Sequence, residues 1–208
     1  MRFFKAGKSK SPVIPVAVGL LMVIVIVFTM TSGNGNDKDY TPGAWEGNVY
    51  TSAFLKLQFT LPEGWTAATP EELDAMMRQA LEQSRADDPA TAKGYENGTV
   101  KNAYELMAQE DGGGGVAAVM SQKMRVSVDS YMDLVRQQYA ETAVINELPG
   151  WTVGGIPYQG LKLETEGKVQ YIYAHYEEGY FTTIQMTGLS DGALEDLKRC
   201  FVDYLPEA

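Results

Sequence analysis

The chain contains one histidine and one cysteine, His175 and Cys200, which are the side chains best suited to covalent or metal chemistry. Together they could form the base and the nucleophile of a thiol hydrolase. No motif surrounds Cys200, and it lies among apolar residues, where a free cysteine behaves as a small hydrophobic side chain. One histidine also cannot supply the ligands of most zinc or iron sites. We therefore expect structural roles for both residues, and neither a metal nor another cofactor.

Acidic residues are the next candidates, because paired carboxylates can act as a general acid and a general base. Four acidic pairs occur at expected helix ends and hairpin ends, where acids favour capping and solubility. These pairs are Glu71-Glu72, Asp87-Asp88, Glu110-Asp111 and Glu177-Glu178. The signatures of serine hydrolases, zinc proteases and phosphate-binding loops are absent from the sequence. A hydrolase with a site of scattered carboxylates or hydroxyls is therefore an alternative function and not the main hypothesis.

Aromatic side chains are numerous, with 12 Tyr, 7 Phe and 3 Trp in the chain. Such residues usually fill the layers between sheets and helices. They can also line a groove for a peptide, a glycan or an apolar ligand. For a groove of this kind, the expected residues are Trp65, Tyr158, Tyr171, Tyr173 and His175.

Apolar patterns and turn signals predict the elements that position these side chains. Thr69, Pro70 and Glu72 have the spacing of a capping box, and apolar residues at helical spacing follow from Leu73. The glycine run at 112–115 precedes a strand-like segment, which predicts a hairpin turn and not a phosphate loop. The expected elements of this half are strands at 49–52 and 55–61, a turn at 62–65, a helix from 70 to about 87, and a hairpin of 102–109 and 116–124.

In the second half of the domain, the sequence pattern predicts a helix at 128–140, a meander of three strands, and a last helix capped by Ser190. The strands are expected at 158–165, 168–177 and 180–187, and the inward stripe of the last helix at Leu194, Leu197, Phe201 and Tyr204. Two-residue turns would place Leu161 and Ile172 on one face of the meander, and Tyr171, Tyr173, Ile184 and Met186 on the other. Since both faces are apolar, we expect the three helices to cover them. The expected fold class is α+β, an antiparallel sheet covered by helices as an α-β-α sandwich.

The segment 49–65, and in particular Phe59-Thr60-Leu61-Pro62-Glu63-Gly64-Trp65, resembles the opening of PsbP-like domains. This group includes relatives of the DcrB and LpqN type and uncharacterised membrane-anchored proteins of Firmicutes. The order of the expected elements from 48 to 205 is also similar to theirs. The resemblance implies an α-β-α sandwich and an accessory or binding module rather than an enzyme. It transfers no catalytic residue.

An uncharged segment at 11–36 follows an N-terminus whose charged residues are all basic, Arg2, Lys5, Lys8 and Lys10. Its apolar core at 13–30 would span roughly 27 Å as a helix, close to the ~30 Å hydrocarbon thickness of a bilayer. No clear cleavage site and no lipidation cysteine follow it. We expect one N-terminal transmembrane helix that acts as an uncleaved signal anchor, with the basic residues in the cytoplasm. The alternative is a protein that is secreted after signal cleavage.

These features divide the chain into a cytoplasmic tail at 1–10, a transmembrane anchor at 11–31, a flexible linker at 32–44 and one extracytoplasmic domain at 45–208. Four of the 17 basic residues precede the anchor and all 27 acidic residues follow it, so the part beyond the anchor has a net charge of −14. Such a charge argues against nucleic acid as a partner.

The main hypothesis is therefore a single-pass protein of the cell membrane with a non-enzymatic extracytoplasmic accessory domain. Its expected partners are the membrane, through the N-terminal helix, and an envelope protein or a small-molecule ligand. The alternatives are the hydrolase described above and a structural subunit of an envelope complex.

Overall fold

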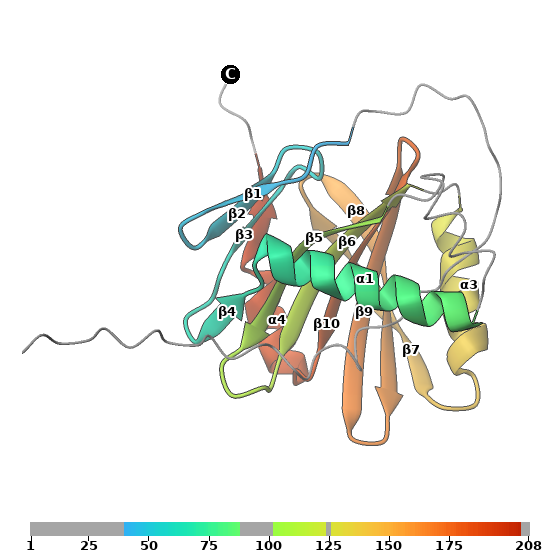
Figure 1. The fold of residues 1–208 in the computed structure, drawn as a ribbon. Helices are drawn as coiled ribbons and strands as arrows, with labels where there is room; N and C mark the ends of the chain where they lie inside the picture. The colour runs from blue at the N-terminus through green and yellow to red at the C-terminus, as the bar shows by residue number, and fades with distance from the viewer. Residues whose placement is uncertain (1–39, 88–101, 124–125, 205–208) are drawn as a thin grey trace, which may run out of the picture.

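The computed structural model describes residues 40–87, 102–123 and 126–204 (Figure 1). The expected cytoplasmic tail at 1–10 and the expected anchor at 11–31 lie outside these residues. None of the described helices is long and apolar enough to cross a bilayer.

The centre of the fold is a seven-stranded antiparallel sheet with the strand order β4-β5-β6-β10-β9-β8-β7. The pairs Thr165↔Lys168 and Glu177↔Tyr180 confirm the two-residue turns expected in the meander. In the second turn, Glu178 and Gly179 both have positive φ, 49° and 89°, as a tight two-residue hairpin loop requires. The strands of this sheet are β4 (Trp65–Ala67), β5 (Asn102–Glu110), β6 (Val116–Lys123), β7 (Val144–Val153), β8 (Ile156–Thr165), β9 (Lys168–Glu177) and β10 (Tyr180–Thr187).

Two helices, α1 (Pro70–Asp87) and α3 (Val128–Tyr139), cover one face of this sheet (Figure 1). The capping box of α1 is confirmed, because Glu72 N–H donates to Thr69 Oγ1 at 3.2 Å and Thr69 N–H donates to Glu72 Oε2 at 2.8 Å. Helix α3 begins after the N-cap Ser127 and packs against β8, β9 and β10. Its buried residues are Tyr131, Met132 and Val135.

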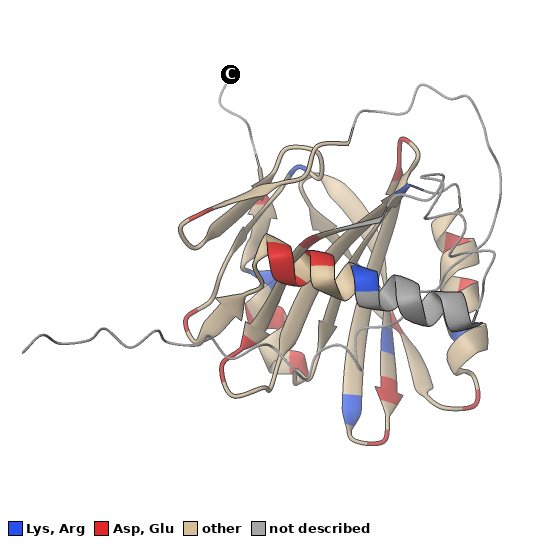
Figure 2. Cartoon of the chain, viewed as in Figure 1, with Lys and Arg blue, Asp and Glu red and all other residues tan. Residues whose placement is uncertain are grey.

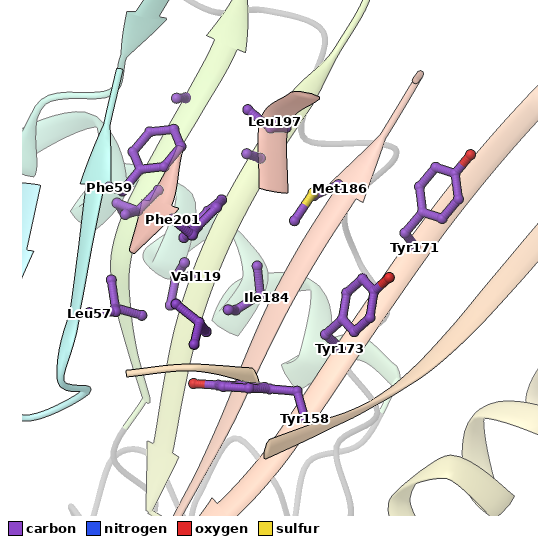
Figure 3. Close-up of a cluster of buried hydrophobic side chains, with 14 of the residues drawn as sticks. Leu57, Phe59, Val119, Tyr158, Tyr171, Tyr173, Ile184, Met186, Leu197 and Phe201 are labelled. Carbon is purple, nitrogen blue, oxygen red and sulfur yellow. The ribbon is translucent and has the colours of Figure 1, made fainter. Parts of the chain in front are cut away.

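A second sheet and a short helix, α4 (Asp191–Lys198), cover the opposite face. The second sheet has the strand order β1-β2-β3-β11. Its strands are β1 (Ala44–Glu46), β2 (Val49–Ser52), β3 (Leu57–Thr60) and β11 (Phe201–Asp203). Figure 3 shows the core on this side, where Leu57 and Phe59 of β3 lie in one cluster with Val119 and Ile184 of the large sheet.

The expected antiparallel sheet with helices is confirmed, but the expected cover of three helices is only partly right. The last helix ends at Lys198, and Phe201 lies in β11, paired with Phe59 at a ring-centroid distance of 4.5 Å. Pairing with β3 satisfies the backbone of this segment while Phe201 stays buried, so a strand replaces the last turn of the predicted helix. The apolar pattern also gives no indication of β7, an edge strand whose side chains are mostly exposed.

Candidate functional site

The structure brings together two of the five residues expected in a groove. Tyr158 on β8 and His175 on β9 are neighbours, with ring centroids 5.5 Å apart. Tyr171 and Tyr173 are each 1% exposed in the core between the sheets, and Figure 3 shows their hydroxyls pointing away from that of Tyr158. Trp65 lies on β4, which three strands separate from β9 in the sheet order. The five residues therefore do not line one common groove.

Tyr158 and His175 instead line a small pocket between the β9–β10 turn, the start of β8 and the loop after β2. The apolar residues that line it are Phe54, Leu55, Ile156, Tyr158 and Tyr180, and the polar ones are His175, Glu177, Glu178 and Thr182. The cavity volume is about 20 Å³, which is enough for one water-sized group. We call this cavity the Tyr158–His175 pocket.

Two of the residues that line this pocket each have a buried polar atom, His175 Nε2 and Tyr158 Oη, with no hydrogen-bond partner within the described part of the chain. His175 Nδ1 is 2.8 Å from the backbone oxygen of Pro157, and because a carbonyl only accepts, Nδ1 carries the proton. In the neutral imidazole the lone pair is then on Nε2, which is an acceptor. A buried polar atom without a partner costs about 1 to 3 kcal/mol. A group that bonded to both atoms would therefore stabilise the native state.

Glu177 adds negative charge beside these atoms. Burial raises the pKa of Tyr158, and the charge of Glu177 raises it further, so the phenol stays protonated. Glu177 Oε1 also accepts from Lys56 Nζ at 3.4 Å, and this ion pair is weak because the two side chains are 42% and 43% exposed. The pocket thus combines aromatic walls, a nitrogen acceptor and a carboxylate.

A separate group of buried polar residues, which we call the Glu105 cluster, consists of Glu105, Tyr40, Tyr50 and Gly43. Glu105 is 5% exposed. Its Oε1 accepts from the Tyr40 hydroxyl at 2.5 Å, and its Oε2 accepts from the Tyr50 hydroxyl and from Gly43 N–H, the latter at 3.2 Å. Burial and then the negative charge of Glu105 raise the pKa of both tyrosines. The carboxylate of Glu105 therefore accepts hydrogen bonds from neutral donors that belong to the same chain.

A β-bulge directs Glu105 into this cluster. The pairing of β5 with β6 shifts between Tyr104 and Leu106, which leaves Glu105 without a partner in the register. Simple alternation would place Glu105 on the face opposite Leu106, whereas its bonds to Tyr50 place it on the same side of the sheet as Leu106. Sequence reasoning missed Glu105 for this reason, because a bulge at a residue other than glycine has no local signal.

Aromatic rings connect the Glu105 cluster with the Tyr158–His175 pocket. Tyr40 stacks on Tyr180 with centroids 5.7 Å apart and contacts Phe54 edge-on at 5.2 Å. Both Tyr180 and Phe54 line the Tyr158–His175 pocket. Tyr40 and Gly43, which were expected in the flexible linker 32–44, thus bond to Glu105 of the large sheet.

Other groups with chemical potential take part in local structure. The Cys200 thiol is partly buried and donates to the backbone oxygen of Asp196 at 3.7 Å, and burial raises its pKa. Glu110 Oε2 accepts from Gly115 N–H at 2.9 Å and so closes the hairpin turn. Figure 2 shows acidic residues spread over helix starts, strand ends and turns. Within the described residues, no three potential metal ligands are grouped.

No protein-family model matches the sequence, and no curated protein matches it. Solved structures that are similar to it include the cyanobacterial PsbP (CyanoP) from Synechocystis sp. PCC 6803 and LpqN, which is involved in cell envelope biogenesis of Mycobacterium tuberculosis. CyanoP is 10% identical with a TM-score of 0.42, over 80% of this chain and 98% of that chain. LpqN is 8% identical with a TM-score of 0.36, over 72% of this chain and 83% of the LpqN chain. Both are of the group that the segment 49–65 resembles, and at this identity the likeness concerns the fold alone.

Proposed function

We propose that the chain is a non-enzymatic accessory protein that binds a ligand or a group of a partner protein in the Tyr158–His175 pocket. One observation carries the proposal: Tyr158 and His175 line the same pocket, and their buried atoms Tyr158 Oη and His175 Nε2 have no hydrogen-bond partner within the described residues. Native proteins satisfy the large majority of their buried polar groups. Two unpartnered atoms on residues of one cavity therefore favour a partner beyond the described residues, and we propose that this partner is a ligand or a group of another protein.

The geometry of the pocket supports binding better than hydrolysis. A hydrolytic site that uses His175 as its base needs a nucleophile that is hydrogen-bonded to the histidine. No hydroxyl or thiol of the described residues bonds to His175 Nε2. Thr182, the aliphatic hydroxyl residue of the pocket, has its Oγ1 3.4 Å from Ser121 Oγ on the neighbouring strand. The pocket can hold a small group, but it contains no assembled nucleophile.

We further propose that the N-terminal segment anchors the protein in the cell membrane with the domain on the extracytoplasmic side. The uncharged run at 11–36 and the four basic residues before it support this orientation. Protease added to intact cells should remove the domain. Full protection of the domain would contradict the proposed orientation.

A comparison of three full-length proteins tests the binding role: wild type, Tyr158→Phe and Tyr131→Phe. Tyr131 of α3 is the matched control, because its hydroxyl is also buried without a partner among the described residues, while its ring packs against Phe181. Each protein is incubated with envelope extract, and the retained small molecules and proteins are identified by mass spectrometry. We expect at least one component that wild type and Tyr131→Phe retain and Tyr158→Phe loses. Equal retention by all three proteins would contradict the proposal.

A further inference from the structure

Building on the proposed function, we infer that the Tyr158–His175 pocket recognises a primary alkylammonium group, the chemistry that ends a lysine side chain or a small amine. This ligand class matches three properties of the pocket: the hydrogen-bonding character of its polar atoms, its aromatic walls and its size.

The polar atoms of the pocket suit a cationic donor. In its neutral form His175 presents a lone pair on Nε2, because Nδ1 donates to the backbone oxygen of Pro157. Tyr158 Oη can also accept, and Glu177 adds a carboxylate. An ammonium group has three N–H donors and no acceptor, whereas a phosphate or carboxylate ligand would place its charge beside Glu177. The polar lining therefore selects a cation over an anion.

The aromatic walls of the pocket favour the same ligand. Phe54 and Tyr180 pack edge to face with centroids 4.9 Å apart, and Tyr158 is the third aromatic residue of the lining. An ammonium group near the face of an aromatic ring is attracted by the ring quadrupole, most strongly where water is excluded. The domain uses this contact elsewhere, since Lys198 Nζ lies 5.4 Å from the ring centroids of both Trp151 and Tyr173.

The size of the pocket restricts the cation. A cavity of about 20 Å³ holds one water-sized group, so the ammonium end enters and the alkyl chain points toward the mouth. A trimethylammonium group carries three additional carbon atoms around its nitrogen and is too large for this volume. A water molecule is of similar size to the ammonium group, and the experiment must distinguish these two occupants.

The charge of the domain helps a cation reach the mouth of the pocket. The chain beyond the expected anchor has a net charge of −14, which attracts cations over the Debye length. Lys56 already pairs with Glu177, but both side chains are about two-fifths exposed, so a ligand ammonium can compete for the carboxylate. The exposed lysine thus shows that Glu177 accepts a bond from an ammonium group.

Nuclear magnetic resonance of the full-length chain in a neutral detergent tests the ligand class, because His175 is the only histidine and gives one set of imidazole signals. We titrate n-butylammonium, with uncharged 1-butanol and tetramethylammonium as ligand controls. We expect a saturable shift of the Nε2 resonance with butylammonium alone. Tyr158→Phe should weaken the affinity about tenfold, because hydrogen bonds to a charged group are strong. Tyr131→Phe should leave it unchanged.

Two histidine variants separate the acceptor from the bond that positions the ring. In His175→Gln an amide oxygen can replace Nε2, whereas His175→Asn keeps a donor near Pro157 and removes the acceptor. Calorimetry should show a larger loss of butylammonium affinity for His175→Asn than for His175→Gln. An N-acetylated trilysine amide distinguishes the two sources of the ammonium group. Tighter binding of the peptide than of butylammonium identifies a protein partner, and the reverse order identifies a small amine.

The absence of a saturable shift with butylammonium, or an equal shift with 1-butanol, would overturn the ammonium assignment. If Tyr158→Phe still loses a component in the envelope experiment, the pocket binds a ligand of another class, and the proposed function stands. If Tyr158→Phe changes the outcome of neither experiment, the ammonium assignment and the proposed function both fail.

Discussion

The two buried polar clusters share a wall of aromatic rings but differ in how their hydrogen bonds are satisfied. Glu105 accepts from two tyrosine hydroxyls and one backbone N–H, all supplied by the chain. In the Tyr158–His175 pocket, Tyr158 Oη and His175 Nε2 have no such partners within the described residues. A buried carboxylate is therefore not in itself a binding site. The cluster with satisfied bonds stabilises the fold, whereas the pocket whose residues have unsatisfied atoms is the site that we propose for a ligand.

The Glu105 cluster also supports the pocket. It joins the segment before β1 to β5 across sequence separations of 65 residues for Tyr40 and 62 for Gly43. The Tyr40 ring then packs against Tyr180 in the pocket wall. Loss of the cluster should therefore affect stability first and the shape of the pocket second.

Removal of the carboxylate should have the largest effect. Glu105→Ala should lower the free energy of unfolding by about 3 to 5 kcal/mol, because two tyrosine hydroxyls and one N–H lose their acceptor in a buried site. Equilibrium unfolding in urea measures the change. A loss below about 1 kcal/mol would show that the cluster does not stabilise the fold as we infer.

Removal of one tyrosine hydroxyl from the Glu105 cluster, and of one from the Tyr158–His175 pocket, compares the two sites more directly. Tyr50 and Tyr158 are 1% and 2% exposed, so Tyr50→Phe and Tyr158→Phe are a matched pair. Tyr50→Phe should cost about 1.5 to 3 kcal/mol, the range for a hydrogen bond to a charged group. Tyr158→Phe should cost nothing or stabilise by up to about 1 kcal/mol, because it removes an unpartnered hydroxyl. Equal losses in urea unfolding would contradict the distinction between the clusters.

Alkaline pH should weaken the Glu105 cluster. Burial and the charge of Glu105 raise the pKa of Tyr50 in the native state above its ordinary value of 10.0. The stability that depends on the neutral phenol is therefore complete below about pH 10 and is lost as the pH rises further, because only the unfolded tyrosine ionises readily. The free energy of unfolding should fall less steeply above about pH 10 in Tyr50→Phe than in wild type. Identical slopes would contradict this role of Tyr50.

The smallest effect concerns the mouth of the pocket. Lys56→Ala removes an exposed ion pair, so the free energy of unfolding should change by less than about 0.5 kcal/mol. The affinity for n-butylammonium should rise about twofold, because Glu177 loses a competing cation. Calorimetry measures the affinity. A lower affinity in Lys56→Ala would argue that the lysine itself helps to bind the ligand.

Sequence patterns predict those parts of the fold that depend on local interactions. The capping box of Thr69 and Glu72 and the two-residue turns of the meander are confirmed, because their hydrogen bonds and backbone angles involve neighbouring residues. Strand β11 is missed because Phe201 is buried by pairing with β3, more than a hundred residues earlier in the chain. The helical spacing of Leu194, Leu197 and Phe201 predicts a longer helix where tertiary pairing forms a strand.

The candidate site can be predicted only in part for the same reason. The predicted meander places Tyr158 and His175 on adjacent strands, and the sequence indicates both as groove residues. Phe54 belongs to the loop after β2, and its position beside Tyr180 depends on how the second sheet packs on the first. Glu105 turns inward through a bulge that alternation does not predict.

The most direct test of the comparison is the free energy of unfolding of wild type, Tyr50→Phe and Tyr158→Phe, each with and without n-butylammonium at matched ionic strength. A ligand that binds only the native state adds about 1.4 kcal/mol at ten times its dissociation constant. We predict this gain for wild type and for Tyr50→Phe, and at the same ligand concentration a gain of only about 0.4 kcal/mol for Tyr158→Phe, because its affinity is about tenfold weaker. An equal gain in all three proteins, or none in wild type, would contradict the assignment of the Tyr158–His175 pocket as the binding site.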